Sequence, residues 1–471
     1  MAMNMDNKEV NISKNVAWID ANILFKDYDS LSNHIIGLVG WIKSNRNNGS
    51  VGFISFHDGT SFQQIQIVYK KQLVNFDEIK KLNTGCSISV IGKITITPDS
   101  SQKFEIQAIE IKILKKISEN YPIQKKNHSD DFLRQNSHLR IRTNKYYSVM
   151  KMRSELAYSI HLFFKNNGFI YLHSPIITNI DPEGAGEAFE LKDNIIDPYW
   201  PKKALLTVSG QFAAEAYAQA FRRVYTFGPT FRAEKSHTSR HLAEFWMVEP
   251  EIAFMNLAQL MDFMENFIKH SIVYMIKYTF EEIKFCNEHI DKNLLEKLNY
   301  VVKNDFKKVD YTNAIKILKN AVKLQKDIFE NSNIYWGMDL NSEHERYLCE
   351  NAFEVPTPIF VYNFPKHSKA FYMKLNDDNK TVAAVDLLVP TVGELCGGSQ
   401  REDDKQKLIN RCLELKMDTE QLKWYLKLRD YGYYRSSGFG LGFDRLLMFI
   451  TGVNNLRDVI PFPRSHGLLD F

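Results

Sequence analysis

The sequence predicts an α+β protein, in which a small β-barrel precedes a larger domain that mixes strands and helices. Three observations support this prediction. Five β-rich runs follow one another between residues 35 and 116, and turn-forming residues separate them. Apolar residues then recur at helical spacing from Tyr146 to Lys165, where the sequence NNG supplies a stop. Further along, two alternating runs, VYTFGPTF and FWMVEPEIAF, predict a hairpin with a long charged connection.

Length and composition bound the class of protein. With 471 residues, the chain is long enough for two or three domains that each bury a core. Apolar residues make up 44% of the chain and aromatic residues 13%, which is typical of ordered globular proteins. We expect no membrane partner, because no uncharged apolar run reaches the roughly eighteen residues that a membrane helix needs. The first fifteen residues also lack the apolar core of a signal peptide.

The cysteine content indicates the redox compartment, and the charge distribution indicates the kind of partner. The five cysteines form no CxxC motif and are odd in number, which favours free thiols in a reducing cytoplasm and argues against a zinc site. Residues 1–150 carry a formal charge of +6 and residues 151–471 carry −2, within a total of +4. A basic front segment is typical of proteins that bind a polyanion, although such a charge often serves solubility alone.

The front segment, residues 1–117, is expected to close into the barrel. A five-stranded barrel with hairpins at NNGS and HDGTS is most often an OB-fold that binds nucleic acids. Arg46, Phe53 and Gln64 would place a cation, a ring and an amide on neighbouring strands, a combination that suits single-stranded bases. Phe53 and Phe56 are three residues apart, so at least one of them is expected in the barrel core.

Residues 118–140 are expected to link the barrel to the rear domain, residues 141–471. Within that domain, the charged connection FRAEKSHTSRHLAEFWMVEPE (231–251) embeds arginines and glutamates among aromatic residues. A solvated loop with surface ion pairs is the alternative explanation, and the interleaved rings argue against it. Three glycine-containing stretches accompany it: SPIITNIDPEGAGEAFEL (174–191), LLVPTVGELCGGSQRE (387–402) and SGFGLGFDRLLMFITGV (437–453).

Each of these stretches is a weak signal alone, but together they fit a polyphosphate ligand with a metal ion. Arg232, Arg240 and Arg445 are fixed cations that can grip phosphates. Glu394, together with Asp386, offers the hard oxygen ligands that Mg²⁺ prefers. The sequence contains no GxxxxGK[ST] loop, so the predicted nucleotide site is not of the Walker type.

These stretches resemble the three signature motifs of the class II aminoacyl-tRNA synthetases, and in particular the asparaginyl branch of their aspartyl/asparaginyl subgroup. Motif 1 resembles GFIYLHSPIIT (168–178), motif 2 the charged connection, and motif 3 GFGLGFDRLL (438–447). The resemblance covers nearly the whole chain. It includes TVSGQFAAE (207–215), KAFYMKLNDDNKTVAAVDLLVP (369–390) and GELCGGSQRED (393–403).

The resemblance implies an OB-fold anticodon-binding domain and a catalytic domain whose six-stranded antiparallel sheet is flanked by helices. It implies a helical insertion at about residues 256–341 and a homodimer with Pro175 of motif 1 at the interface. The implied reaction is the ATP-dependent attachment of L-asparagine to tRNA(Asn) through an asparaginyl-adenylate, with release of AMP and pyrophosphate. ATP is then a substrate and Mg²⁺ its metal ion.

The family pattern also implies roles for individual residues. Arg232, Glu394 and Arg445 would carry catalysis, with Arg232 on the α-phosphate and Arg445 on the γ-phosphate. The rest of the ATP site would be Glu234, Arg240, His241, Leu242, Gly442 and Phe245, the last stacking on adenine. Glu394 and Asp386 would hold Mg²⁺. The amino acid would lie among Glu183, Ser209, Gln211, Glu249 and Arg401, and the anticodon among Arg46, Phe53 and Gln64.

The aspartyl enzymes share all three motifs, so the choice between asparagine and aspartate rests on charge. A carboxylate in a desolvated pocket needs cations, and the aspartyl family places a lysine where this chain has Ala214, by spacing from Ser209 and Gln211. Arg401 with the carboxylate of Glu249 suits a neutral amide instead. The alternative for Glu249 is that it orients the α-ammonium. An aspartyl enzyme and a non-catalytic tRNA-binding relative are the alternative functions.

Overall fold

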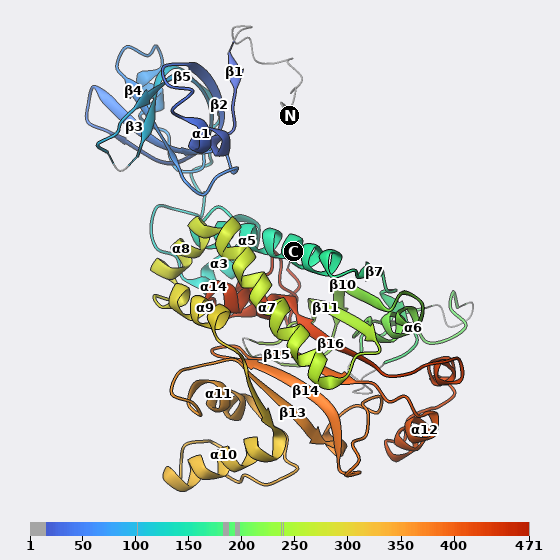
Figure 1. The fold of residues 1–471 in the computed structure, drawn as a ribbon. Coiled ribbons are helices and arrows are strands. Elements are labelled where there is room, and N and C mark those ends of the chain that lie inside the picture. Colours follow the sequence, from blue (N-terminus) through green and yellow to red (C-terminus); the bar gives the residue numbers. More distant parts are fainter. Residues whose placement is uncertain are drawn as a thin grey trace. The chain divides into compact units, whose positions relative to one another are not determined.

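The computed structural model describes residues 16–100, 102–181, 188–193, 198–236, 238 and 240–470. The chain divides into two compact units, residues 1–144 and 145–471 (Figure 1). In the part that is described, no helix combines the length and the apolar character needed to cross a membrane.

The first unit contains a closed barrel. Its strands are β2 (Ile35–Asn47), β3 (Val51–His57), β4 (Ile65–Lys70), β5 (Ser87–Ile96) and β6 (Phe104–Lys115). The order β2-β3-β4-β6-β5 closes because β5 also pairs with β2. The five-stranded barrel predicted from the sequence is therefore confirmed. Elements that the sequence patterns did not predict are β1 (Ala17–Trp18), α1 (Ala21–Asp27), α2 (Phe76–Ile79), α3 (Asp130–Gln135) and α4 (Ser137–Arg140).

Strict alternation along β3 separates the barrel core from its outer face. Phe56 is fully buried, whereas Phe53 is partly exposed on the other face, so the prediction that at least one of them is core is confirmed. Gly52 shares the buried face and lies against Tyr69, whose hydroxyl donates to Asn45 Oδ1 at 2.9 Å. Any Cβ at position 52 would overlap the Tyr69 ring.

The second unit is organised around an eight-stranded sheet in the order β12-β13-β14-β15-β16-β11-β10-β7. The six central strands pair antiparallel, which confirms the sheet implied by the resemblance. They are β13 (Ile359–Pro365), β14 (Thr381–Val389), β15 (Gly393–Gln400), β16 (Ser436–Gly442), β11 (Glu244–Ala253) and β10 (Arg223–Phe231). The edge strands β12 (Lys307–Asp310) and β7 (Ile170–Tyr171) pair parallel to their neighbours. The predicted hairpin is β10 and β11.

Period-two alternation gives this sheet two different faces. One face is apolar, and residues such as Val248, Val385 and Phe439 join the largest core. The helices on that core include α5 (Asn144–Asn166), α7 (Leu257–Tyr278), α8 (Phe280–His289), α9 (Leu294–Lys303) and α14 (Phe443–Thr451). Glu249 and Asp386 neighbour Val248 and Val385 in sequence, so they point to the opposite face. That face carries the polar residues considered below.

The remaining elements of the second unit surround the sheet. Helix α5 confirms the helix predicted from Tyr146 to Lys165, and Gly168 follows it with a φ of +74°. The other strands and α-helices are β8 (Ile177–Thr178), β9 (Leu205–Leu206), α6 (Gln211–Phe221), α10 (Tyr311–Leu324), α11 (Ser342–Glu350), α12 (Lys405–Glu414) and α13 (Lys423–Lys427).

The contact between Gly52 and Tyr69 makes the barrel core sensitive to one methyl group. We expect Gly52→Ala to destabilise the barrel by about 1–3 kcal/mol, because the added Cβ forces the buried Tyr69 ring away from Asn45. Hydrogen–deuterium exchange of the full chain would show faster exchange in β2, β3 and β4. Ser50→Ala, in the exposed β2–β3 turn, is the control, and equal exchange in the two variants would contradict the prediction.

Candidate functional site

Glu249 organises the turn that leads into α6. Its carboxylate accepts from the Gly210 backbone N–H at 2.8 Å, from the Thr226 hydroxyl at 3.0 Å and from the Ser209 hydroxyl. A Cβ at Gly210 would lie 2.6 Å from Ser174 Oγ, so this close approach requires glycine. The structure therefore brings Ser209 and Glu249 together, as the sequence analysis expected.

Arg401 is buried and pairs with a carboxylate that the sequence analysis did not single out. Its Nε donates to Glu251 Oε2 at 3.2 Å, and its NH2 group donates to the other oxygen of the same carboxylate. Its NH1 donates to Ser399 Oγ at 2.7 Å. Burial raises the pKa of Glu251, and the guanidinium of Arg401 opposes that rise. The carboxylate fits because a Cβ at Gly438, its cross-strand partner, would overlap it.

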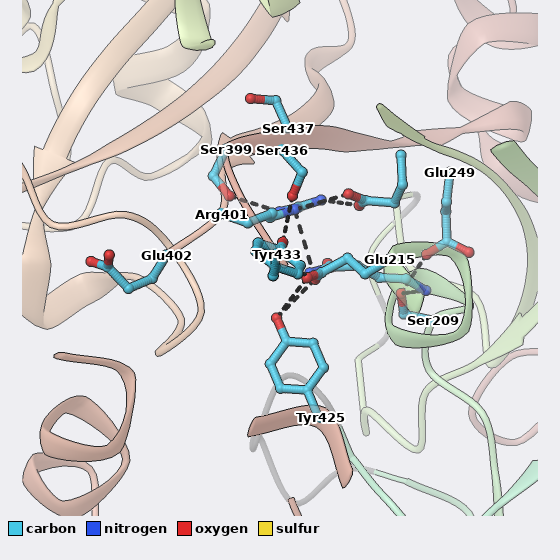
Figure 2. Close-up of polar contacts among 12 residues, drawn as sticks. Ser209, Glu215, Glu249, Ser399, Arg401, Glu402, Tyr425, Tyr433, Ser436 and Ser437 are labelled. Carbon is cyan, nitrogen blue, oxygen red and sulfur yellow. Dashed lines mark hydrogen bonds and ion pairs between the residues drawn. The ribbon is translucent and has the colours of Figure 1, made fainter. Parts of the chain in front are cut away.

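Glu215 lies on the other side of Arg401, 3.9 Å from its Nε, and is fully buried on α6. Figure 2 shows its carboxylate at the centre of a hydrogen-bonded cluster. The donors to it are Gln211 Nε2 at 3.0 Å, the Tyr425 hydroxyl at 2.9 Å, the Tyr433 hydroxyl at 3.1 Å and Arg429 NH2 at 3.3 Å. Ala214, by contrast, lies in a small apolar cluster with Ala218 and Val224.

The two arginines predicted to bind the ends of the triphosphate lie on different elements. Arg232 follows β10, and its guanidinium carbon is 5.4 Å from the centroid of the Phe245 ring on β11. Arg445 lies in the first turn of α14, three residues after the N-cap Gly442. Its NH1 donates to the Glu394 backbone carbonyl at 2.6 Å, and the same nitrogen is 3.9 Å from Glu394 Oε2.

Glu394 and Asp386 converge over a glycine on β15. A Cβ at Gly397 would lie 3.0 Å from Glu394 Oε1 and 3.4 Å from Asp386 Oδ1. Asp386 is not free, because its Oδ2 accepts from Lys369 Nζ at 2.6 Å. Burial raises the pKa of Asp386 to about 6, Glu394 adds to the rise and Lys369 opposes it. Burial also raises the pKa of Glu345, which accepts the Glu394 N–H at 3.2 Å, to about 7.

A metal ion at this point would need ligands from outside the protein. Among the described residues, no three His, Cys, Asp or Glu side chains are arranged to hold a metal by themselves. Mg²⁺ in nucleotide sites is usually bound by one or two carboxylates, with phosphate oxygens and water as the other ligands. Glu394 and Asp386 fit that requirement.

The connection between β10 and β11 is tied down by polar contacts. His241 Nε2 is 3.5 Å from Glu234 Oε2, and its Nδ1 is 3.1 Å from Ser236 Oγ. Arg240 NH2 donates to the Thr391 carbonyl at 3.4 Å, which fixes the connection to the β14–β15 turn. Leu242 differs from these residues because it is buried in the main core.

The three barrel residues predicted to grip the anticodon lie on one face of the first unit. Arg46 and Phe53 are cross-strand partners on β2 and β3. Gln64, just before β4, accepts a hydrogen bond from Ser55, which lies two residues beyond Phe53 on the same face. Their side chains are exposed or partly exposed, as a ligand-binding face requires.

Two kinds of candidate site residue remain: one that lies outside the described residues, and several that the sequence patterns did not identify. Glu183 falls outside the described residues. The sequence patterns did not identify Glu215, Glu251, Arg429 or Lys369 as site residues. A signal for Glu215 was available, since it is the lone charged residue in the helix QFAAEAYAQAF. No local pattern marks Arg429.

Comparison with protein families assigns both units. Residues 129–466 match the family described as tRNA synthetases class II (D, K and N), and residues 36–114 match the OB-fold nucleic acid binding domain. The asparagine–tRNA ligase of Mycoplasmoides gallisepticum is 58% identical over 437 residues, which cover 92% of this chain and 95% of the relative. That of Bacillus cereus is 48% identical over 462 residues, covering 95% and 98% of the two chains.

Solved structures give the same assignment. The asparaginyl-tRNA synthetase of Pyrococcus horikoshii, complexed with asparaginyl-adenylate, aligns with a TM-score of 0.84 at 34% identity, covering 93% of this chain and 97% of that one. A putative aspartyl-tRNA synthetase from Leishmania major aligns with a TM-score of 0.81 at 20% identity, which shows a shared fold alone. The chain therefore belongs to the class II tRNA synthetases and, within them, to the asparagine–tRNA ligase family.

Proposed function

We propose that this chain attaches L-asparagine to tRNA(Asn) in an ATP-dependent reaction that passes through asparaginyl-adenylate and releases AMP and pyrophosphate. The observation that carries the proposal is the polar face of the catalytic sheet, which holds both parts of such a site. Arg445 beside Glu394 suits a triphosphate. The buried polar cluster around Arg401 has the polarity of an amide site, and Ala214 supplies no second cation there.

In the first step, the asparagine carboxylate attacks the α-phosphorus of ATP, and pyrophosphate leaves. An already ionised carboxylate needs no general base, so catalysis comes from positioning and from stabilising charge. Arg232 contacts the α-phosphate and Arg445 holds the γ-phosphate. Glu394 and Asp386 would hold Mg²⁺, which would supply positive charge against the phosphate oxygens. Because Asp386 Oδ2 already accepts from Lys369 Nζ at 2.6 Å, Glu394 would be the principal ligand.

The remaining site residues position the two substrates. Phe245 offers its ring to the adenine, and the other residues around ATP are Glu234, Arg240, His241, Leu242 and Gly442. Ser209, Gln211, Glu249 and Glu183 surround the amino-acid end. Glu249 already accepts hydrogen bonds from Ser209, Gly210 and Thr226. Its contribution is therefore to hold these residues in place and to compensate the positive charge of the substrate ammonium group.

In the second step, the terminal ribose hydroxyl of the tRNA takes the asparaginyl group from the adenylate. The barrel recognises the anticodon through Arg46, Phe53 and Gln64. Support comes from their position on one face and from the match of residues 36–114 to a nucleic-acid-binding family. The reaction takes place in the cytoplasm, where the five buried free cysteines stay reduced.

The active form is a homodimer that buries the outer face of α5 and the β7 edge, next to Pro175. Tyr158 and Leu162 are one helical turn apart on α5, and their exposed fractions are 65% and 40%. Ile170 on the edge strand β7 is 47% exposed. Apolar side chains gathered at a sheet edge are expected to be covered by a partner.

The proposal is tested by ATP–pyrophosphate exchange without tRNA, run in parallel with asparagine and with aspartate. Exchange with asparagine alone is the expected result. Exchange with aspartate alone would make the chain an aspartyl enzyme, and exchange with neither would favour a non-catalytic tRNA-binding relative.

The role of Arg232 predicts a large loss in the first step. We expect Arg232→Ala to lower the rate of ATP–pyrophosphate exchange by about a hundredfold or more, because the charge that develops at the α-phosphate loses its cation. Circular dichroism should show an unchanged fold. Near-normal exchange in the folded variant would exclude this role.

The role of Phe53 predicts a defect confined to tRNA. We expect Phe53→Ala to weaken aminoacylation by the equivalent of about 1–3 kcal/mol, the usual contribution of stacking one base on a ring. Exchange without tRNA should be unchanged, because Phe53 belongs to the first unit. Val51→Ala, on the same face of β3, is the control, and a loss of both activities would mean that the change disrupts the barrel.

If the apolar face of α5 forms the dimer interface, charged side chains introduced there should lower the mass of the particle in solution. We expect the double variant Tyr158→Asp/Leu162→Asp to sediment at half the mass of the parent in analytical ultracentrifugation, because the interface cannot desolvate two carboxylates. Tyr278→Asp, at the exposed end of α7, is the control. A double variant with the parent's mass would place the interface elsewhere, and a parent that is itself monomeric would exclude the dimer.

A further inference from the structure

Four charged groups form an alternating row behind the amino-acid end of the site. Glu251 pairs with Arg401, Arg401 lies 3.9 Å from Glu215, and Glu215 accepts from Arg429 at 3.3 Å. All four side chains are buried, with exposed fractions of 9% or less. The row of Glu251, Arg401, Glu215 and Arg429, here called the charge row, contains two carboxylates and two guanidinium groups, so its formal charge is zero.

Arg401 is the member of the charge row with N–H hydrogens left over for a ligand. A guanidinium carries five N–H hydrogens. Three of those on Arg401 donate to Glu251 and Ser399, and in the described part of the chain the other two have no acceptor. Both oxygens of Glu251 accept from Arg401, which is the geometry of an ion pair. Arg401 therefore offers two hydrogens while its charge is already balanced.

Glu215, unlike Arg401, has its hydrogen-bonding atoms already occupied within the protein. Its two oxygens accept from Tyr425, Tyr433, Gln211 and Arg429. Arg429 is equally enclosed, with Nε donating to the Glu402 carbonyl at 3.1 Å and the Tyr433 ring centroid 4.1 Å away. The hydrogen-bonding groups of Glu215 and Arg429 are thus used within the protein. Each would therefore act on a substrate bound at Arg401 through its charge alone.

We propose that Glu215 and Arg429 are specificity-determining residues. Together they keep the net charge of the charge row at zero, and this neutrality makes the site unfavourable for aspartate. The inference rests on the proposed function. A neutral carboxamide can accept both free hydrogens of Arg401 without changing the charge of the site. A side-chain carboxylate would add a negative charge in a buried region where every cation is already matched by an anion, and that charge would stay uncompensated.

The decisive variant removes one charge from the row without removing volume. Glu215→Gln leaves one surplus positive charge beside Arg401. We expect the ratio of kcat/KM for aspartate to that for asparagine, measured by ATP–pyrophosphate exchange, to rise at least about tenfold. Glu251→Gln creates the same surplus on the other side of Arg401 and is the variant to measure if Glu215→Gln does not fold.

A second variant separates charge from hydrogen bonding. Glu215→Gln/Arg429→Met removes one carboxylate and one guanidinium, so the net charge of the charge row is again zero. Replacing both members of a buried pair is better tolerated than removing one. We expect this double variant to fold and to return the ratio to within about threefold of the wild type. A residue that acted through its hydrogen bonds would leave the double variant as altered as the single one.

The matched control is the same substitution at a neighbouring buried carboxylate. Glu402→Gln removes a charge next to Arg401 in sequence, but the Glu402 side chain points away from the charge row in Figure 2 and bonds to the Leu375 N–H at 3.0 Å. Its ratio should equal that of the wild type.

The outcomes are distinguishable. A wild type that exchanges with asparagine, a raised ratio in Glu215→Gln and its reversal in the double variant would support the inference. An unchanged ratio in folded Glu215→Gln, or a double variant as altered as the single one, would overturn the inference alone. A wild type that does not exchange with asparagine would overturn the proposed function as well.

Discussion

Period-two alternation in the six antiparallel strands is the constraint on which the rest of the second unit depends. Residues of one parity, such as Val248 and Val385, join a core covered by α5, α7 and α14. Their neighbours Glu249 and Asp386 therefore face the other way and are free to be polar. Because the helices stabilise one face, the opposite face can hold several charges without the strands losing their packing.

Glycines on this polar face make room for the charged groups. Gly438 lies opposite Glu251, and Gly397 lies under Glu394 and Asp386, so that a Cβ at either position would approach the carboxylates too closely. The glycine-rich stretch of motif 3 thus forms a strand, β16, which leads directly into α14. Its small residues are explained by the volume of the side chains on neighbouring strands.

Charge compensation is the second organising feature of the site. Lys369 balances Asp386, Arg401 balances Glu251, and Arg429 balances Glu215. Each pair is at least partly buried, where an unmatched charge would be costly. The paired groups around the predicted substrate side chain therefore sum to zero charge, and the arginines predicted to bind the phosphates, Arg232 and Arg445, lie on other elements. This division separates the region that selects the amino acid from the region that activates it.

The sequence by itself determined the two-domain α+β organisation, the five barrel strands, the hairpin of β10 and β11, and helix α5, because each rests on a short-range period or a turn signal. Residues in motifs, such as Arg232 and Glu394, were recognisable for the same reason. The tertiary structure alone decided which charges meet. Arg401 and Glu251 are 150 positions apart and Arg429 and Glu215 are 214 apart, so no local pattern could report these pairs. Only strand register and the packing of α6 against the sheet bring them together.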